Sequence, residues 1–268
     1  MTSTTTNVDD RTWPVLVILA YVAMVAMNAL ANALPLFGRN TGEVSGQFPS
    51  LFTPAPYTFS VWGLIYLALA GFAVFQVLAR NRRATSPTAR HLTYLRPLFV
   101  LSCLLNIGWL VAWHALQIVL SEVLMLGLLG TLITLYRRSG AWRPPATSGE
   151  RWFVWAPLSL YLGWITVATV ANTAITLLDL GFDGGTAAVA ITVVVVGVAA
   201  VLGLLGSLRR RDGIYTLVVA WGLGGVAAAR AGEVSVLVVV ALVCVTVLVA
   251  VGLWALVNGS RATRTQPS

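Results

Sequence analysis

Eight apolar segments of about the length of a membrane span dominate the sequence. A transmembrane helix needs about 17–25 predominantly apolar residues. The mean hydropathy is +0.85 and only 10% of the residues are charged, whereas soluble domains are about one-quarter charged. The sequence therefore predicts an all-α polytopic membrane protein with about eight transmembrane helices, at residues 14–36, 58–79, 97–115, 118–136, 153–178, 186–208, 214–229 and 234–257.

The first apolar run is interpreted as a membrane span rather than as a cleaved signal peptide. Ala31 and Ala33 offer the small-residue pattern of a cleavage site. However, Asp9 and Asp10 outweigh Arg11 before the run. The run is also longer than the about 7–15 apolar residues of a signal peptide. We therefore expect the first span to be retained.

The arginines are distributed unevenly over the two sides of the membrane. The chain contains 17 basic residues of the Lys and Arg type, all of them arginine, and only Arg39 and Arg230 lie on the side opposite the two termini. Because Lys and Arg are enriched in short cytoplasmic loops, we expect both termini in the cytoplasm and the protein in the cell membrane as a multi-pass protein. The net charge of +8 then reflects topology and contact with the lipid bilayer, and no nucleic-acid partner is expected.

The residue content excludes or disfavours several classes of active site. Without lysine, the chain lacks the amine of a retinal-type Schiff base and the lysine of a Walker A phosphate-binding loop. His91 and His114 stand apart from cysteine and acidic partners, so no metal site is expected. Glu122 lies at the start of the fourth span, where the helix dipole favours an acidic residue. We therefore predict neither catalytic residues nor metal ligands.

Aromatic and amide side chains form stripes on three of the predicted spans. Residues three or four positions apart lie on one face of a helix. The stripes lie at similar depths and therefore indicate a shared interior surface. Periodicity alone leaves packing between helices as an alternative, since Asn and Trp also bridge and fill helix interfaces. The stripes consist of Phe59, Trp62 and Tyr66 on the second span, Asn106, Trp109 and Trp113 on the third, and Tyr161, Trp164, Ala168 and Asn172 on the fifth.

Three motifs in these spans resemble those of the TspO/MBR tryptophan-rich sensory proteins, in the larger form with extra C-terminal transmembrane helices. The second-span motif is Pro54-Ala55-Pro56-Tyr57 followed by Phe59, Trp62, Ile65-Tyr66 and Gly71. The third-span motif is Leu105-Asn106-Ile107-Gly108-Trp109, and the fifth-span motif is Trp164 followed by Ala168 and Asn172. The resemblance covers about residues 13–179. Two positions depart from the family pattern, because Tyr57 stands near a usual Trp and Pro157 precedes Trp164 by more than the usual interval.

The resemblance implies a TspO-like five-helix transmembrane bundle over residues 1–180, with a hydrophobic pocket capped by the loop after the first helix. Residues 181–268 then form a three-helix transmembrane extension and a short cytoplasmic tail. Members of this family bind porphyrins and other flat hydrophobic molecules, which implies a membrane receptor or binding protein with a sensory or regulatory role. A transporter of a hydrophobic small molecule and a tetrapyrrole-degrading enzyme stay open as alternatives. No cofactor is expected to be obligatory, and a porphyrin or other tetrapyrrole as ligand and a homodimer are both left open.

The expected binding site combines the aromatic stripes with the loop at residues 37–57. Prolines 54 and 56 restrict the chain where the second span begins. Pockets for small ligands are typically apolar with a few orienting polar groups. We therefore predict that the loop is a lid over a ligand site formed by Tyr57, Phe59, Trp62, Tyr66, Asn106, Trp109, Trp113, Trp164, Ala168 and Asn172.

Overall fold

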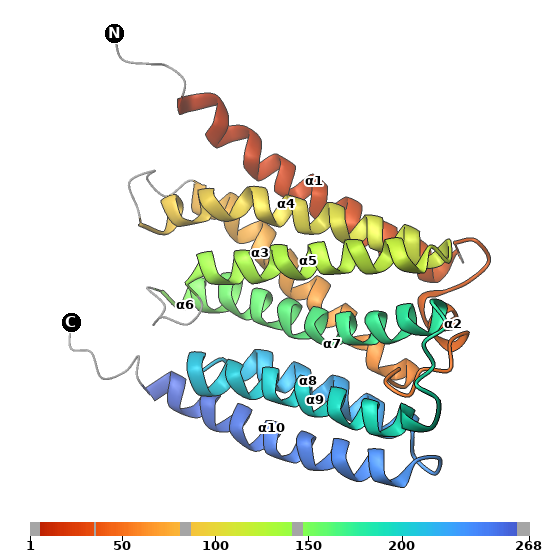
Figure 1. Ribbon diagram of the computed structural model, residues 1–268. Helices are drawn as coiled ribbons and strands as arrows, with labels where there is room; N and C mark the ends of the chain where they lie inside the picture. The colour runs from red at the N-terminus through yellow and green to blue at the C-terminus, as the bar shows by residue number, and fades with distance from the viewer. Residues whose placement is uncertain (1–5, 35, 81–86, 141–146, 262–268) are drawn as a thin grey trace.

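The long helices of the computed structural model, which describes residues 6–34, 36–80, 87–140 and 147–261, form one bundle (Figure 1). Seven of them are long and apolar enough to cross a membrane. The remaining helix, α9, has 17 residues, which is the lower limit for a span. The prediction of an all-α polytopic membrane protein is confirmed. The long helices are α1 (Thr6–Ala33), α3 (Val61–Arg80), α4 (Pro87–His114), α5 (Ile118–Ser139), α7 (Ala156–Asp179), α8 (Ala188–Arg210), α9 (Gly213–Ala229) and α10 (Ser235–Arg261).

The two ends of the bundle differ in character. Helix α1 begins and α10 ends at the same end (Figure 1). The last turns of α5 and α8, with Arg137, Arg138, Arg209 and Arg210, also lie there, and we call it the arginine-rich end. The opposite end carries the segment 36–55 between α1 and η1, and we call it the loop end.

Short helices complete the connections between the long ones. At the loop end, α2 (Thr41–Gly46) and the 3₁₀ helix η1 (Pro56–Ser60) precede α3. At the arginine-rich end, α6 (Ser148–Glu150) and the π-type turn η2 (Arg151–Trp155) lead into α7. The 3₁₀ turn η3 (Gly185–Ala187) precedes α8.

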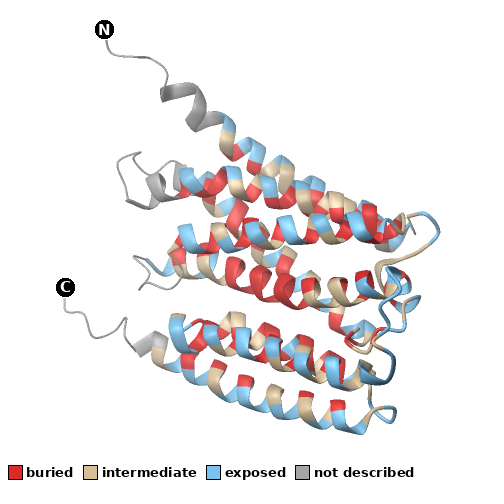
Figure 2. Ribbon diagram, in the orientation of Figure 1, coloured by how far each residue is buried: buried red, intermediate tan, exposed pale blue. Residues whose placement is uncertain are grey.

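Helix α7 is the most deeply buried long helix of the described chain. In the span that contains it, 72% of the most apolar window is buried, against 22% for the spans of α8 and α10. Residues 157–167 are all buried, and Figure 2 shows this run as the nearly continuous red stretch of α7. Its neighbours are α3, α5, α8 and α9. Helix α7 therefore presents side chains to both halves of the bundle.

Helix α9 joins the C-terminal helices to α7 through close contacts at glycine. A Cβ atom at Gly222 would lie 2.6 Å from a methyl carbon of Val167, and one at Gly163 would lie 3.0 Å from Val218 Cβ. Small residues at such positions let transmembrane helices approach closely. The second face of α9 packs against α8 and α10.

The helix boundaries differ from the predicted spans most clearly in α4. This helix begins at Pro87, ten residues before the predicted start of the span, because hydropathy does not detect a helix that continues through polar residues. Arg96, expected in a loop, is instead buried in α4 and donates through Nε to Gln76 Oε1 at 3.1 Å. The predicted domain division at residue 180 falls in the turn between α7 and α8 and stays a prediction.

Candidate functional site

Trp62 occupies the centre of an aromatic cluster between α3, α4 and α7. Its ring stacks on Tyr66 with 5.4 Å between ring centroids and on Trp109 with 6.4 Å. The edges of Trp164 and Tyr161 meet it at 6.2 Å and 6.0 Å. Offset-stacked and edge-to-face pairs at these distances contribute about 0.5–1.5 kcal/mol beyond area burial. The three predicted stripes therefore do meet on one interior surface.

Further rings extend the cluster toward the loop end. Trp113 stacks on Trp109 at 6.1 Å, and Phe59 meets Trp164 edge-on at 5.8 Å. Trp109, Trp113 and Trp164 are each buried, and only 1% of Trp164 is exposed. The cluster therefore lies toward the loop end of the bundle, where α3 begins and α4 ends.

A hydrogen-bonded polar group adjoins the rings on the side of α5. Trp109 Nε1 donates to Asn172 Oδ1 at 3.1 Å, and Asn172 Nδ2 donates to Glu122 Oε2 at 2.7 Å. Thr173 Oγ1 donates to the other carboxylate oxygen of Glu122 at 2.6 Å. The Glu122 carboxylate thereby fixes which way the Asn172 amide points, so that the amide oxygen faces the Trp109 indole.

Asn106, expected to orient a ligand, pairs through its carbonyl oxygen with a residue of α1. Asn28 Nδ2 donates to Asn106 Oδ1 at 2.9 Å, and both side chains are buried. This contact between α1 and α4 satisfies the Asn106 carbonyl oxygen. Asn106 is not among the residues that line either cavity described below.

Two cavities lie on opposite sides of the Trp62 and Trp109 rings. The smaller, of about 30 Å³, lies toward α7. The larger, of about 350 Å³, lies toward α1 and beneath α2. Both cavities have Phe59, Trp62, Trp109 and Thr41 in their walls, so these rings form a partition. The smaller cavity is also lined by Trp113, Trp164, Ala168 and Asn172, and the larger by Asn28, Ser60 and Tyr66.

Because of this partition, the expected single ligand site is divided into two cavities. A drug-sized ligand needs a pocket of about 300–1,000 Å³, which the cavity toward α1 reaches and the cavity toward α7 does not. Of the described residues that line these two cavities, Trp164 and Tyr66 have a buried polar atom, Nε1 and Oη respectively, without a hydrogen-bond partner. Such donors favour a polar atom of a bound molecule, because an unpaired buried donor is costly.

Tyr57 does not lie in the walls of these two cavities. Its side chain is 52% exposed and meets the ring of Trp221 of α9 edge-on at 5.6 Å. Trp221 Nε1 in turn donates to Thr58 O at 2.9 Å. Tyr57 and Trp221 therefore fasten η1 to α9, and Trp221 does not line these cavities either.

The loop over the site is attached at two places. Near its start, α2 is capped by Asn40, and Trp113 Nε1 donates to Thr41 O at 3.3 Å. Near its end, Ala55 N donates to Gly225 O of α9 at 3.0 Å. Phe52 is buried with residues of α8, α9 and α10. The segment thus bridges α4 and the C-terminal helices above the aromatic cluster.

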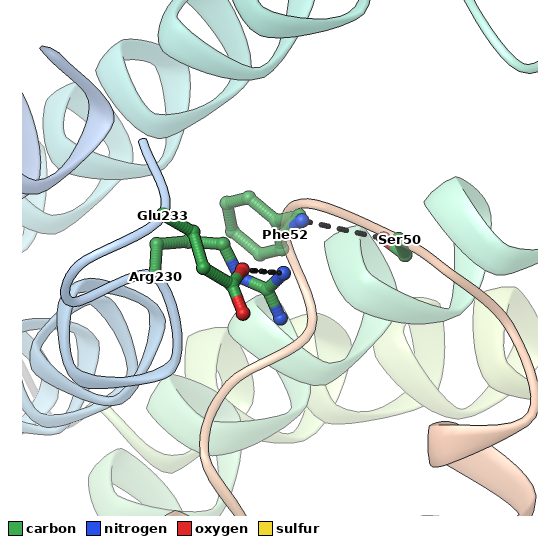
Figure 3. Close-up of polar contacts among 4 residues, drawn as sticks. All are labelled: Ser50, Phe52, Arg230 and Glu233. Carbon is green, nitrogen blue, oxygen red and sulfur yellow. Dashed lines mark hydrogen bonds and ion pairs between the residues drawn. The ribbon is translucent and has the colours of Figure 1, made fainter. Parts of the chain in front are cut away.

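The turns beside Phe52 carry their own polar contacts. Phe52 N donates to Ser50 Oγ at 3.3 Å, and Arg230 forms an ion pair with Glu233 at 2.9 Å in the turn between α9 and α10. Figure 3 shows both contacts. Arg230, expected on the outer side, is held by this pair. Among the described residues, no group of three or more His, Cys, Asp and Glu side chains is placed to hold a metal ion.

Sequence reasoning missed Asn28 and Glu122 as parts of the site. A polar residue within a membrane span is by default a candidate for function, and Asn28 lies within the first apolar run. The position of Glu122 in the sequence indicates only the start of a helix, whereas its carboxylate accepts hydrogen bonds from Asn172 and Thr173. Partners more than 45 residues away in the chain leave no local pattern.

Comparison with known proteins gives one finding. The family model described as TSPO-like protein matches residues 14–254. The match continues through α8, α9 and most of α10, whereas the motifs recognised in the sequence end near residue 179. No curated protein matches the chain, and no solved structure does.

Proposed function

Because the chain belongs to the family of TSPO-like proteins, we propose that it is a membrane protein that binds a flat hydrophobic molecule against the Trp62 and Trp109 rings. The observation that carries the proposal is the aromatic partition between two cavities, one of about 350 Å³. Aromatic faces recognise flat ring systems through offset stacking. Asn28 and Ser60 in the walls of the larger cavity supply the few polar groups that orient a ligand.

A porphyrin or another tetrapyrrole is the proposed ligand class, and a sensory or regulatory role is the proposed use of binding. A macrocycle needs more room than the cavity toward α1 alone, so its binding requires the Trp62 and Trp109 rings to turn. Its carboxylates cannot stay charged within the membrane without partners. They are therefore expected to point to the loop end, where Arg39 lies in the segment over the site.

The proposal is tested by ligand titration of matched tryptophan variants. The purified protein in detergent is titrated with protoporphyrin IX while tryptophan fluorescence is followed. Trp164→Ala removes a ring that contacts Trp62 and Phe59, and we expect affinity to fall by roughly tenfold or more, corresponding to about 1.4 kcal/mol. Trp254→Ala removes a ring of α10 that is 51% exposed and serves as the control.

The titration, together with transport and photochemical assays, distinguishes a binding protein from a packing role of the rings, a transporter and an enzyme. Equal losses in Trp164→Ala and Trp254→Ala would mean that the rings only pack helices together. Accumulation of the ligand in sealed vesicles would indicate a transporter, and a light-dependent product would indicate a tetrapyrrole-degrading enzyme. Saturable binding without either supports a receptor or binding protein.

We also propose that the arginine-rich end faces the cytoplasm, so that both termini lie inside the cell. The support is the excess of arginines at that end, since cytoplasmic loops are enriched in Lys and Arg. Reporter fusions after Ser268 test the orientation, with a fluorescent protein active inside and a phosphatase active outside. Phosphatase activity at this position would overturn the proposed topology.

A further inference from the structure

A separate cavity of about 440 Å³ lies at the arginine-rich end, in the seam between α5, α7, α8 and α9. Its polar rim carries the side chains of Arg137, Arg209 and Arg210. Its walls also contain the apolar residues Leu129 and Leu202. These two leucines precede Arg137 and Arg209 by eight and seven residues on their helices, which places them about 10–12 Å deeper along the helix axes.

The wall of this cavity carries positive charge only. Among the described residues that line it, none is acidic. The carboxylate of Asp212, close by, already accepts hydrogen bonds from Tyr136 Oη at 2.7 Å, Ser159 Oγ at 2.6 Å and Tyr215 N at 3.0 Å. Burial raises the pKa of the Asp212 carboxyl group, which further limits its power to neutralise arginine.

The exposure of the arginines leaves the rim accessible. Arg137 and Arg209 are exposed, and Arg210 lies with its guanidinium carbon 5.9 Å from the centre of the Tyr136 ring. A guanidinium group binds phosphate oxygens through two parallel hydrogen bonds. Basic pockets between transmembrane helices typically bind anionic lipid headgroups.

A second cavity of similar size lies at the loop end, and its wall differs in charge from that of the first. It has a volume of about 500 Å³ and lies between α7 and α8 beneath residues 49–52. The described residues in its walls include Asp183 and no arginine. Both cavities are lined by α7 and α8. The arginines are therefore the feature that distinguishes the cavity at the arginine-rich end.

We infer that the cavity between α5, α7, α8 and α9 binds one anionic phospholipid, with its phosphate at Arg137 and Arg209 and an acyl chain along Leu129 and Leu202. The apolar depth of the cavity favours a lipid over a free phosphate ion, which needs only the rim. This site is distinct from the aromatic cluster, and it does not depend on the function proposed for that cluster.

The inference is tested on the full-length protein by native mass spectrometry. Protein purified in mild detergent is mixed with phosphatidylglycerol, phosphatidylcholine or inorganic phosphate, and the bound fraction is measured. The double variant Arg137→Gln/Arg209→Gln is compared with Arg138→Gln/Arg211→Gln, which removes the same charge from exposed residues outside the cavity. We expect phosphatidylglycerol binding to weaken by roughly tenfold or more in the first variant only, since Arg137 and Arg209 supply the charge that attracts the anionic headgroup.

A second variant tests the apolar part of the site. Leu205→Trp places a larger side chain in the wall of the cavity and leaves every arginine in place. We expect it to reduce phosphatidylglycerol binding as well. Equal loss in both arginine variants would show general attraction to a basic surface and overturn the inference. Equal binding of phosphatidylcholine, or displacement of the lipid by inorganic phosphate, would overturn it too.

Discussion

The helices around α7 and the three C-terminal helices fill the membrane interior in different ways. Around α7, large rings meet at centroid distances of 5.4–6.4 Å, and the Trp109 indole is hydrogen-bonded to Asn172. Among α8, α9 and α10, small residues bring the helices together, as at Gly203, where a Cβ atom would lie 2.8 Å from a methyl carbon of Leu248.

The difference has a structural consequence. Cavities of about 30 Å³ and 350 Å³ border the Trp62 and Trp109 rings. Close contacts at Gly163 and Gly222 hold α9 firmly on α7, while the cavities of about 440 Å³ and 500 Å³ lie beside α8. The ring-rich region is therefore suited to accept a flat aromatic ligand, whereas α9 supports α7 and the segment above the site.

The largest expected effect tests the support of α7 by α9. Gly222→Ala would place a methyl group 2.6 Å from Val167 of α7, whereas the same change at Gly224 meets nothing closer than 4.0 Å. Overpacking of this kind costs about 1–3 kcal/mol. We expect a clear loss of thermal stability in detergent for Gly222→Ala and little change for Gly224→Ala. Equal stability of the two variants would contradict the close contact.

An effect no larger than this is expected from two acidic residues, Glu122 beside the aromatic rings and Glu233 in the turn between α9 and α10. Glu122→Ala leaves Asn172 Nδ2 with only the 3.3 Å contact to Ser121 Oγ, and loss of a partner for a buried donor costs about 1–3 kcal/mol. Glu233→Ala breaks the Arg230 pair, whose Glu side chain is 61% exposed, and such pairs contribute about 0–1 kcal/mol.

Thermal unfolding in the same detergent compares the loss of stability in Glu122→Ala with that in Glu233→Ala. We expect the larger loss for Glu122→Ala. A larger loss for Glu233→Ala would mean that the turn between α9 and α10, and not the polar group beside the rings, limits stability.

The smallest expected effect concerns the segment above the site, which we propose to act as a lid. Trp113→Phe keeps a ring beside Trp109 but removes the hydrogen bond to Thr41 O. A net contribution of about 0.5–1.5 kcal/mol corresponds to roughly twofold to tenfold faster ligand entry and exit. Stopped-flow fluorescence measures both rates, and unchanged rates would argue against the lid.

Much of the fold could be predicted from the sequence, but less of the site. Apolar run length alone indicates the number of helices, and helical periodicity brings Trp62, Trp109 and Trp164 to one surface. Periodicity gives the face of a helix and not its partner, so the pairing of Asn106 with Asn28 and the contact of Tyr57 with Trp221 were not predicted. The partition of the site into two cavities depends on side-chain orientation, which no sequence pattern records.

Photolabelling tests most directly whether the ring-rich region, and not the C-terminal extension, accepts the ligand. A flat hydrophobic probe that carries a diazirine is bound to the full-length protein in detergent, irradiated, and mapped by peptide mass spectrometry with and without excess protoporphyrin IX. We predict competed labelling in peptides of α3 and α4 that contain Trp62 and Trp109. Competed labelling confined to α8 and α10 would contradict it.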